Sequence, residues 1–316
     1  MIRKISHTLA FGAFLAASAS ALADAPASAW QDIAAGDTAK ALAQAWPLAA
    51  DGRIDVGNIS GKVQVSGWNQ AQVRLEGTLG AGSTLVVTGN ARSLNLRVKA
   101  TKTGWFGSDS PTHGSTLILH VPKDAALDLN VVSADANVDG MAGPTLKVGS
   151  VSGDVALSSA APQIDVDSVS GNVTVTAAGT AAGKTHVQTV SGDVHAKDLG
   201  GRIKLETVSG TMHCACASVT ELETGSVSGD ADVAVAPAGD ARVHMSSMSG
   251  NLRLSIPAAT SARIDASSFS GDIRSDFGQP QEKSHGPGSS LKATIGGGDA
   301  QIQIESLSGD VRLSKQ

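Results

Sequence analysis

Apolar and polar residues alternate along most of this chain, and the alternation recurs around a phrase of the form hydrophobe-Ser-Gly-(Asp/Asn). The glycines of this phrase stand at positions 153, 171, 192, 210, 229, 250, 271 and 309, and a degenerate copy without the glycine begins at Val132. The steps between them range from 18 to 21, apart from a final step of 38, which equals two steps of 19. A fixed period of this size is typical of proteins that stack one small structural unit on the next.

Each position can be named by its offset from the glycine of its repeat. Columns −7, −5, +2 and +4 hold mainly Val, Ile and Leu, and column −2 holds the hydrophobe of the phrase. Alternation on both sides of a Ser-Gly corner predicts two short strands joined by a bend. We therefore expect all five columns to be buried, with Val155, Val173 and Val194 stacked in column +2.

One repeat cannot bury its own apolar row, but strands stacked at about 4.8 Å pair their backbone groups and align like side chains. Recurrent glycine and β-branched apolar columns disfavour helices. The fold class is thus predicted to be all-β: a single-chain, parallel, β-helix-like β-solenoid whose rungs follow the glycine steps of 18 to 21. Either handedness is compatible with the pattern. The less regular N-terminal third predicts antiparallel or irregular strands that start or cap the stack.

The chain divides into three predicted segments. Residues 1–23 have the basic start, short apolar run and Ala-Leu-Ala cleavage site of a secretory signal peptide. Residues 24–50 form an alanine-rich segment, in which a short helix over about residues 30–45 is a candidate cover for the open end of the stack. Residues 51–316 form the β-solenoid.

These features predict a periplasmic or secreted protein. Residue 24, directly after the predicted cleavage site, is Asp and not Cys, so a lipoprotein anchor is not expected. No later apolar run reaches the roughly 20 residues that span a membrane, so a membrane span is not expected either. Removing residues 1–23 removes two cations and no acids, which changes the net charge from −5 to −7. Nucleic acid and anionic lipid are therefore disfavoured as partners.

Acidic residues recur at column +1, and they resemble a calcium ladder at first sight. The column is interrupted by Asn172, Thr211 and Asn251. Asp and Asn also bond nearby backbone groups at bends, so turn chemistry is the favoured interpretation over metal binding. The aspartates concerned are Asp154, Asp193, Asp230, Asp272 and Asp310.

Column +3 places His195, His213 and Asp232 on three consecutive rungs, where they could share a transition metal. The alternative is a solvated ladder, because the column continues with Arg253 and Arg274. The solvated ladder is favoured, so no cofactor is expected. Column −6 alternates in charge and is interpreted as a structural ladder of ion pairs.

Two further features concern single sites. Cys214 and Cys216 share the apolar parity of their strand, and residues two apart on a strand lie at the long limit for a disulfide, which favours buried thiols. Two Gly/Pro/Ser-rich stretches, residues 103–115 and 278–290, are predicted loops. The first presents Trp105 and Phe106, which either cover the stack or serve as partner-binding anchors.

Four stretches carry a family resemblance: residues 63–76, residues 119–139, the VSGD repeats, and residues 294–313. In this order they resemble the bacterial putative-adhesin family, also called the toastrack family, a β-strand-repeat family of unknown function. The resemblance covers about residues 51–316. It implies a β-solenoid, usually in exported or envelope-associated proteins, and it implies no catalytic residues.

The predicted function is that of a non-catalytic, exported cell-envelope protein, an adhesin-like or scaffold module that binds a protein or a surface. No nucleophile motif, phosphate loop or zinc-protease helix is present in the sequence. The alternatives are a glycan-binding or glycan-active β-helix protein and a metal-binding envelope protein. The identity of the partner and the oligomeric state are left open.

Overall fold

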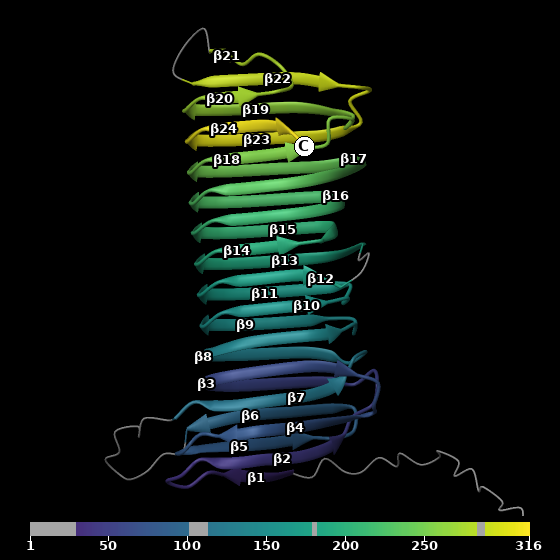
Figure 1. Cartoon of the computed structure of the whole chain (residues 1–316), viewed down its shortest axis with the longest axis vertical. Helices are drawn as coiled ribbons and strands as arrows, with labels where there is room; N and C mark the ends of the chain where they lie inside the picture. Colours follow the sequence, from purple (N-terminus) through teal and green to yellow (C-terminus); the bar gives the residue numbers. More distant parts are fainter. Residues whose placement is uncertain (1–29, 101–112, 179–181, 283–287) are drawn as a thin grey trace, which may run out of the picture.

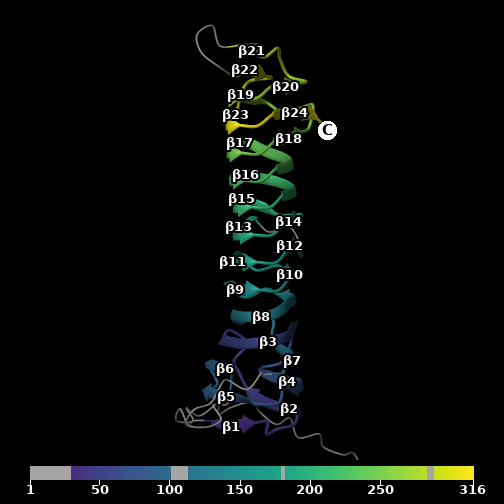
Figure 2. The same cartoon turned by 90° about the vertical axis from the view of Figure 1, so that its left-hand side faces the viewer.

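The computed structural model describes residues 30–100, 113–178, 182–282 and 288–316, and these are strands joined by turns. The strands form one long stack (Figure 1), and a view from the side separates each rung into two facing strands (Figure 2). The all-β solenoid is confirmed. Within the described ranges, no helix is long and apolar enough to cross a membrane.

One face of the stack, the first face, carries the strands that lead into the Ser-Gly corner. Neighbouring strands pair in the order given, with β3, β8, β16 and β17 contributing one part each to this face. From the N-terminal end the strands are β1 (Trp30–Ala34), β5 (Ser83–Gly89), β6 (Ser93–Ala100), β3 (Arg53–Trp68), β8 (Ala126–Met141), β9 (Leu146–Ser152), β11 (Gln163–Ser170), β13 (Ala182–Ser191), β15 (Gly200–Ser209), β16 (Met212–Ser228), β17 (Ala231–Ser249), β23 (Ala300–Ser308), β19 (Ala262–Ser270), β22 (Ser289–Ile295) and β21 (Gln281–Glu282).

The second face carries the strands that leave the corner. It contains the other parts of β3, β8, β16 and β17. Its remaining strands, in stacking order, are β2 (Lys40–Pro47), β4 (Gln72–Leu79) and β7 (Ser115–Pro122) below β3, then β10 (Val155–Ser159), β12 (Val173–Ala177) and β14 (Val194–Lys197), and finally β18 (Leu252–Ile256), β24 (Val311–Lys315) and β20 (Ile273–Ser275).

Equivalent residues lie directly above one another in the middle of the stack. Val155 pairs in parallel register with Val173, and Val173 with Val194. All three are buried, as are the other residues of columns −7, −5, +2 and +4 apart from the half-buried Ser275. These four columns are confirmed as the core. The N-terminal end of the stack switches to antiparallel pairing as expected, and the other end does so as well, where β22 pairs with β19.

The glycine of each corner is required by the rung below it. Gly171 has a φ of +112°, and an added Cβ would collide with the carbonyl oxygen of Gly153. Gly192 is in the same position above Gly171, with a φ of +136°. Positive φ angles and this close approach both exclude a side chain, which explains why the corner repeats its glycine.

The order of the rungs differs from the order of the chain at both ends. Strand β3 lies between β8 and the pair β6 and β7, which follow it in sequence. At the other end, the C-terminal strands β23 and β24 are inserted between β17/β18 and β19/β20. The final step of 38 along the chain is therefore not two successive rungs. The antiparallel strand β22 covers β19 instead of forming a rung.

The helix expected over residues 30–45 is wrong. The segment forms strands β1 and β2, which pair antiparallel with β5 and β4. Leu42 and Leu48 are buried, and Trp46 packs against the core. Short alanine-rich helices are marginal in water, so pairing at the open end of the stack outweighs local helix propensity.

The expected burial of column −2 is also wrong. Its side chains are about half exposed, for example 49% in Val169 and 45% in Val190. The alternation of inward and outward side chains continues to the end of the strand. Column −3 therefore points inward, like columns −7 and −5, and column −2 points outward. In the glycine repeats, the buried residues at column −3 all carry hydroxyl groups: Ser150, Ser168, Thr189, Thr207, Ser226, Ser247, Ser268 and Ser306.

Candidate functional site

The residues of column −2 form one continuous apolar column along the outside of the first face. The strands that bear them are neighbours in the stack, so each side chain adjoins the next. Their exposed fractions lie between 45% and 56%. In stacking order the apolar column comprises Val132, Val151, Val169, Val190, Val208, Val227, Met248, Leu307 and Phe269.

A shallow groove runs beside the first four members of the apolar column. Its volume is about 430 Å³, and its lining includes Val151, Val169 and Val190 together with Asp167 and Gly149. Gly149 contributes no side chain to the outer face, so the groove is open next to the valines. The groove therefore joins the apolar column to the acidic column −4.

Acidic residues border the apolar column on both sides. Column −4 on one side contributes Asp167, Glu206 and Glu305. The corner on the other side contributes Asp135, Asp154, Asp193, Asp230, Asp310 and Asp272. Along these nine rungs, columns −4, −1 and +1 contain no Lys or Arg. Acidic residues thus flank the apolar column on both sides, and one of them, Glu206, is itself paired with Lys204 and His186.

The corner acids also bond the rungs to one another. Oδ1 of Asp154 accepts a hydrogen bond of 2.8 Å from the backbone N–H of Asn172, whose own Oδ1 accepts one of 3.2 Å from Asp193. Asp193 continues the pattern with a bond of 2.8 Å from the N–H of Thr211. Both Asp and Asn serve in this ladder, because each supplies the acceptor oxygen. The side chains of column +1 therefore bond backbone groups at the corner, as the turn interpretation proposed, but the groups belong to the next rung and not to their own bend.

The candidate metal ligands His195, His213 and Asp232 lie on neighbouring strands and line one small pocket of about 200 Å³. The rings of His195 and His213 stack at 5.1 Å with an angle of 5° between their planes. Asp232 follows in register with His213. Among the residues that the structure places, no group of three or more His, Cys, Asp or Glu side chains has an arrangement suited to a metal ion. The arrangement is a ladder of stacked side chains on the second face.

Cys214 and Cys216 are joined by a disulfide, so the expectation of free thiols is wrong. Both are buried, as predicted, and their Cα atoms are 5.7 Å apart, within the usual range for a bridge. The strand is irregular directly after them, where the pairing register shifts between Ala217 and Val219. Sequence spacing alone does not reveal this local shortening.

Column −6 forms part of the predicted ladder of ion pairs, with His186 next to Asp165 and Lys204 next to Glu223, and it also reaches Glu206 of column −4. His186 lies 3.2 Å from Asp165 and 3.3 Å from Glu206, and Nζ of Lys204 lies 3.0 Å from Glu206. Burial raises the pKa of Glu206, but hydrogen bonds from Lys204 and His186 outweigh this and hold the pKa below its ordinary value. The hydrogen bond to Glu206 likewise raises the pKa of Lys204.

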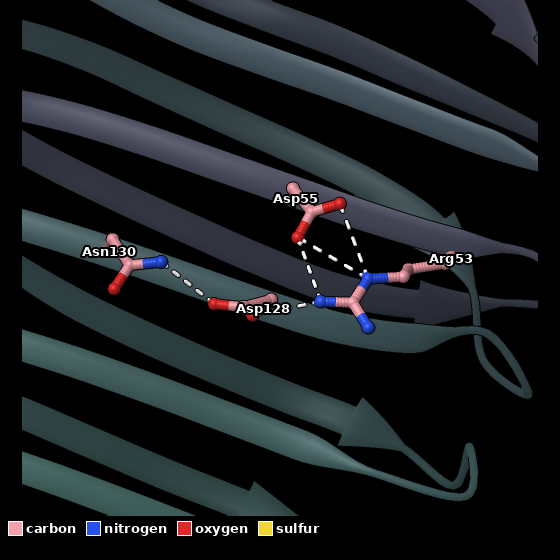
Figure 3. A network of polar contacts seen from close by, with 4 residues as sticks. All are labelled: Arg53, Asp55, Asp128 and Asn130. Carbon is pink, nitrogen blue, oxygen red and sulfur yellow. Dashed lines mark hydrogen bonds and ion pairs between the residues drawn. The ribbon is translucent and has the colours of Figure 1, made fainter. Parts of the chain in front are cut away.

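A similar network ties the N-terminal rungs together, as Figure 3 shows. The guanidinium of Arg53 on β3 pairs with Asp55 at 3.2 Å and with Asp128 on β8 at 3.1 Å. The amide of Asn130 donates to Asp128 at 2.7 Å. Arg53 thus joins the carboxylates of two neighbouring strands, β3 and β8.

The loop with Trp105 and Phe106 lies outside the described residues, so its role as cover or anchor stays a prediction. The apolar column is the surface that sequence analysis missed. A signal for it was present, since the adjacent column −3 consists only of Ser and Thr in the glycine repeats. Small hydroxyl residues at the inward parity indicate that the hydrophobe next to them points outward.

The fold and surface define a single-chain β-solenoid with an apolar column on one face and a hydrogen-bonded acidic corner. The model of the Toastrack DUF4097 family matches residues 52–314, and the chain belongs to this family. The sequence matches none of the curated proteins with which it was compared.

Several solved structures are similar along most of their length. A "putative lipid binding protein" from Parabacteroides distasonis is 12% identical, with 90% of this chain and 99% of that chain covered and a TM-score of 0.39. A "putative adhesin" from Bacteroides fragilis is 8% identical, with 88% and 97% covered and a TM-score of 0.35. One from Parabacteroides merdae is 10% identical, with 90% and 98% covered and a TM-score of 0.34.

Proposed function

We propose that this protein is an exported, non-catalytic interaction module that binds a protein partner through its apolar column. The observation that carries the proposal is the unbroken row of half-exposed Val, Met, Leu and Phe side chains along nine rungs. Soluble proteins seldom expose contiguous apolar patches without using them in an interaction.

The fold supports recognition by side chains. Strands such as β11 are paired on both sides, with β9 and β13. Their backbone groups are therefore already bonded, and a partner in the middle of the stack cannot join as an added strand. Specificity at this surface must come from side chains, and the most distinctive ones are those of the apolar column and its acidic border.

Export to the periplasm or the medium is part of the same proposal. It is supported by the signal-like sequence of residues 1–23 and by the Cys214–Cys216 disulfide, since disulfides persist mainly in oxidising compartments. Mass spectrometry of the mature N-terminus tests it. A chain that begins at Asp24 is expected, and a retained Met1 on protein in the cytoplasm would refute export.

Site-specific photocrosslinking in intact cells tests the docking surface. A photoreactive amino acid at Val208 should trap a discrete partner protein, whereas the same group at the exposed Arg253 on the second face serves as the matched control. Equal crosslinking at both positions, or none at Val208, would contradict the proposal.

A further inference from the structure

The nature of the occupant follows from the charge and spacing around the apolar column. We propose that the apolar column binds a cationic, amphipathic α-helix, which lies along the stack axis with its apolar stripe on the valines. This inference rests on the proposed function and specifies the chemistry of the partner. It is carried by the acidic border, the paired backbone and the rung spacing.

Charge selects a basic partner. The border of the apolar column contains Asp and Glu on both sides and no Lys or Arg in its three columns. Lys or Arg side chains on either flank of an apolar stripe would meet these acids, which attracts the partner and fixes its orientation. A second copy of this chain would place acid against acid, and an anionic membrane surface would be repelled in the same way.

Geometry selects a helix. Neighbouring rungs are about 4.8 Å apart, whereas successive side chains on one side of an extended strand are about 6.6 Å apart. The apolar stripe of an α-helix repeats with each turn, at about 5.4 Å. Four rungs are separated by three spacings. Over this length the apolar side chains of the helix fall out of step with the rungs by about 2 Å, which flexible side chains accommodate. The side chains of an extended strand fall out of step by about 5 Å.

The groove beside Val151, Val169 and Val190 is the place where we expect the helix to bind. It lies where Gly149 leaves space in column −4 and Asp167 supplies charge at its wall. Asp154 and Asp193 stand at the corner on two of the same rungs, and each uses an oxygen that Asn can replace in the ladder. The acidic border can therefore be neutralised without loss of the ladder bonds.

The test uses the mature protein and a synthetic peptide with Leu on one helical face and Lys on both flanks, made long enough to form a stable helix. One variant removes apolar surface: Val151→Thr, Val169→Thr and Val190→Thr. The other removes charge: Asp154→Asn, Asp167→Asn and Asp193→Asn. Control peptides replace every Lys by Glu or scramble the sequence so that the apolar stripe is lost. Binding is followed by fluorescence anisotropy at two salt concentrations, with thermal unfolding as a check of folding.

The Lys peptide should bind the parent protein and bind each variant at least about tenfold more weakly. Its affinity should fall as salt rises, and both control peptides should fail to bind. Equal binding to the parent and the Val→Thr variant, or equal binding of the scrambled peptide, would overturn the proposal. So would dimerisation through the apolar column in analytical ultracentrifugation, or binding to anionic vesicles that the Val→Thr variant loses. If crosslinking at Val208 succeeds while the Lys peptide does not bind, the proposed function stands and this inference is wrong.

Discussion

Oδ1 of Asp310 accepts a hydrogen bond of 3.0 Å from the backbone N–H of Asp272, a residue 38 positions earlier in the chain. On its other side, the N–H of Asp310 donates to Oδ1 of Asn251 at 3.2 Å. The last repeat therefore closes the ladder between two rungs that precede it. Strands β23 and β24 are therefore internal elements of the stack, although they follow β19 and β20 in the sequence.

Hydrogen exchange tests this insertion. Strand β23 has parallel partners on both sides, β17 and β19, whereas β20 has one paired neighbour, β24, among the strands that the structure describes. Amides of residues 300–308 should therefore be protected as strongly as those of β17, and more strongly than those of residues 273–275. Exchange of residues 300–308 at the rate of the β20 amides would show that the last repeat forms an edge.

The corner glycines should be intolerant of substitution. Gly192→Ala would force a side chain into a positive-φ position against the carbonyl oxygen of Gly171. We expect a loss of at least about 2 kcal/mol in the free energy of unfolding, measured with urea. Gly239, with open space around it, is the control, and Gly239→Ala should change little. A similar effect of both substitutions would contradict the packing of the corner.

The acidic ladder should depend on an acceptor oxygen and not on charge. Asp193→Asn keeps the oxygen that accepts from the N–H of Thr211, whereas Asp193→Ala removes it. Asn should leave stability nearly unchanged, and Ala should cost about 1 kcal/mol in urea unfolding. If Asn proved as damaging as Ala, the charge itself would be the stabilising feature, and a bound cation would need to be considered.

The ion pairs of column −6 should make a small contribution that is lost in acid. The pKa of Glu206 is lower in the folded protein than in the unfolded chain, so its contribution is present above the unfolded pKa of about 4.3 and disappears as the pH falls through the folded value. Glu206→Gln should therefore cost only a few tenths of a kcal/mol at pH 7, because the side chain is about 36% exposed and the pairs are partly screened by water. Near pH 2, where the carboxyl group is protonated, the substitution should cost nothing. A cost that is equal at both pH values would point to packing instead.

Sequence periodicity predicted much of this fold, and its failures have physical causes. Columns such as +2, with Val173, were found because β-branched residues recur at most rungs. Column −2 was wrongly predicted to be buried, because the strand keeps its alternation up to Ser170 and so turns the hydrophobe of the phrase outward. The hydroxyls of column −3 were the available signal.

Other features were beyond the pattern. The apolar columns of different rungs are interchangeable, so nothing in Ile302 or Ile304 specifies that β23 lies next to β17. The Cys214–Cys216 bridge depends on a local shortening of the strand that spacing does not encode. The candidate site consists of column −2, so the wrong prediction that this column is buried also hid the docking surface.

The central claim is that column −2 faces outward, and two matched double variants test it most directly. Val169→Thr with Val190→Thr changes the apolar column, whereas Val166→Thr with Val187→Thr changes fully buried residues of the same two strands. Urea unfolding gives the free energy of unfolding of each variant. For the outward pair it should lie within about 1 kcal/mol of the parent value. For the inward pair it should fall by roughly 2 to 6 kcal/mol, because two hydroxyl groups enter the core. A large loss for the outward pair, or equal losses for both, would contradict the account.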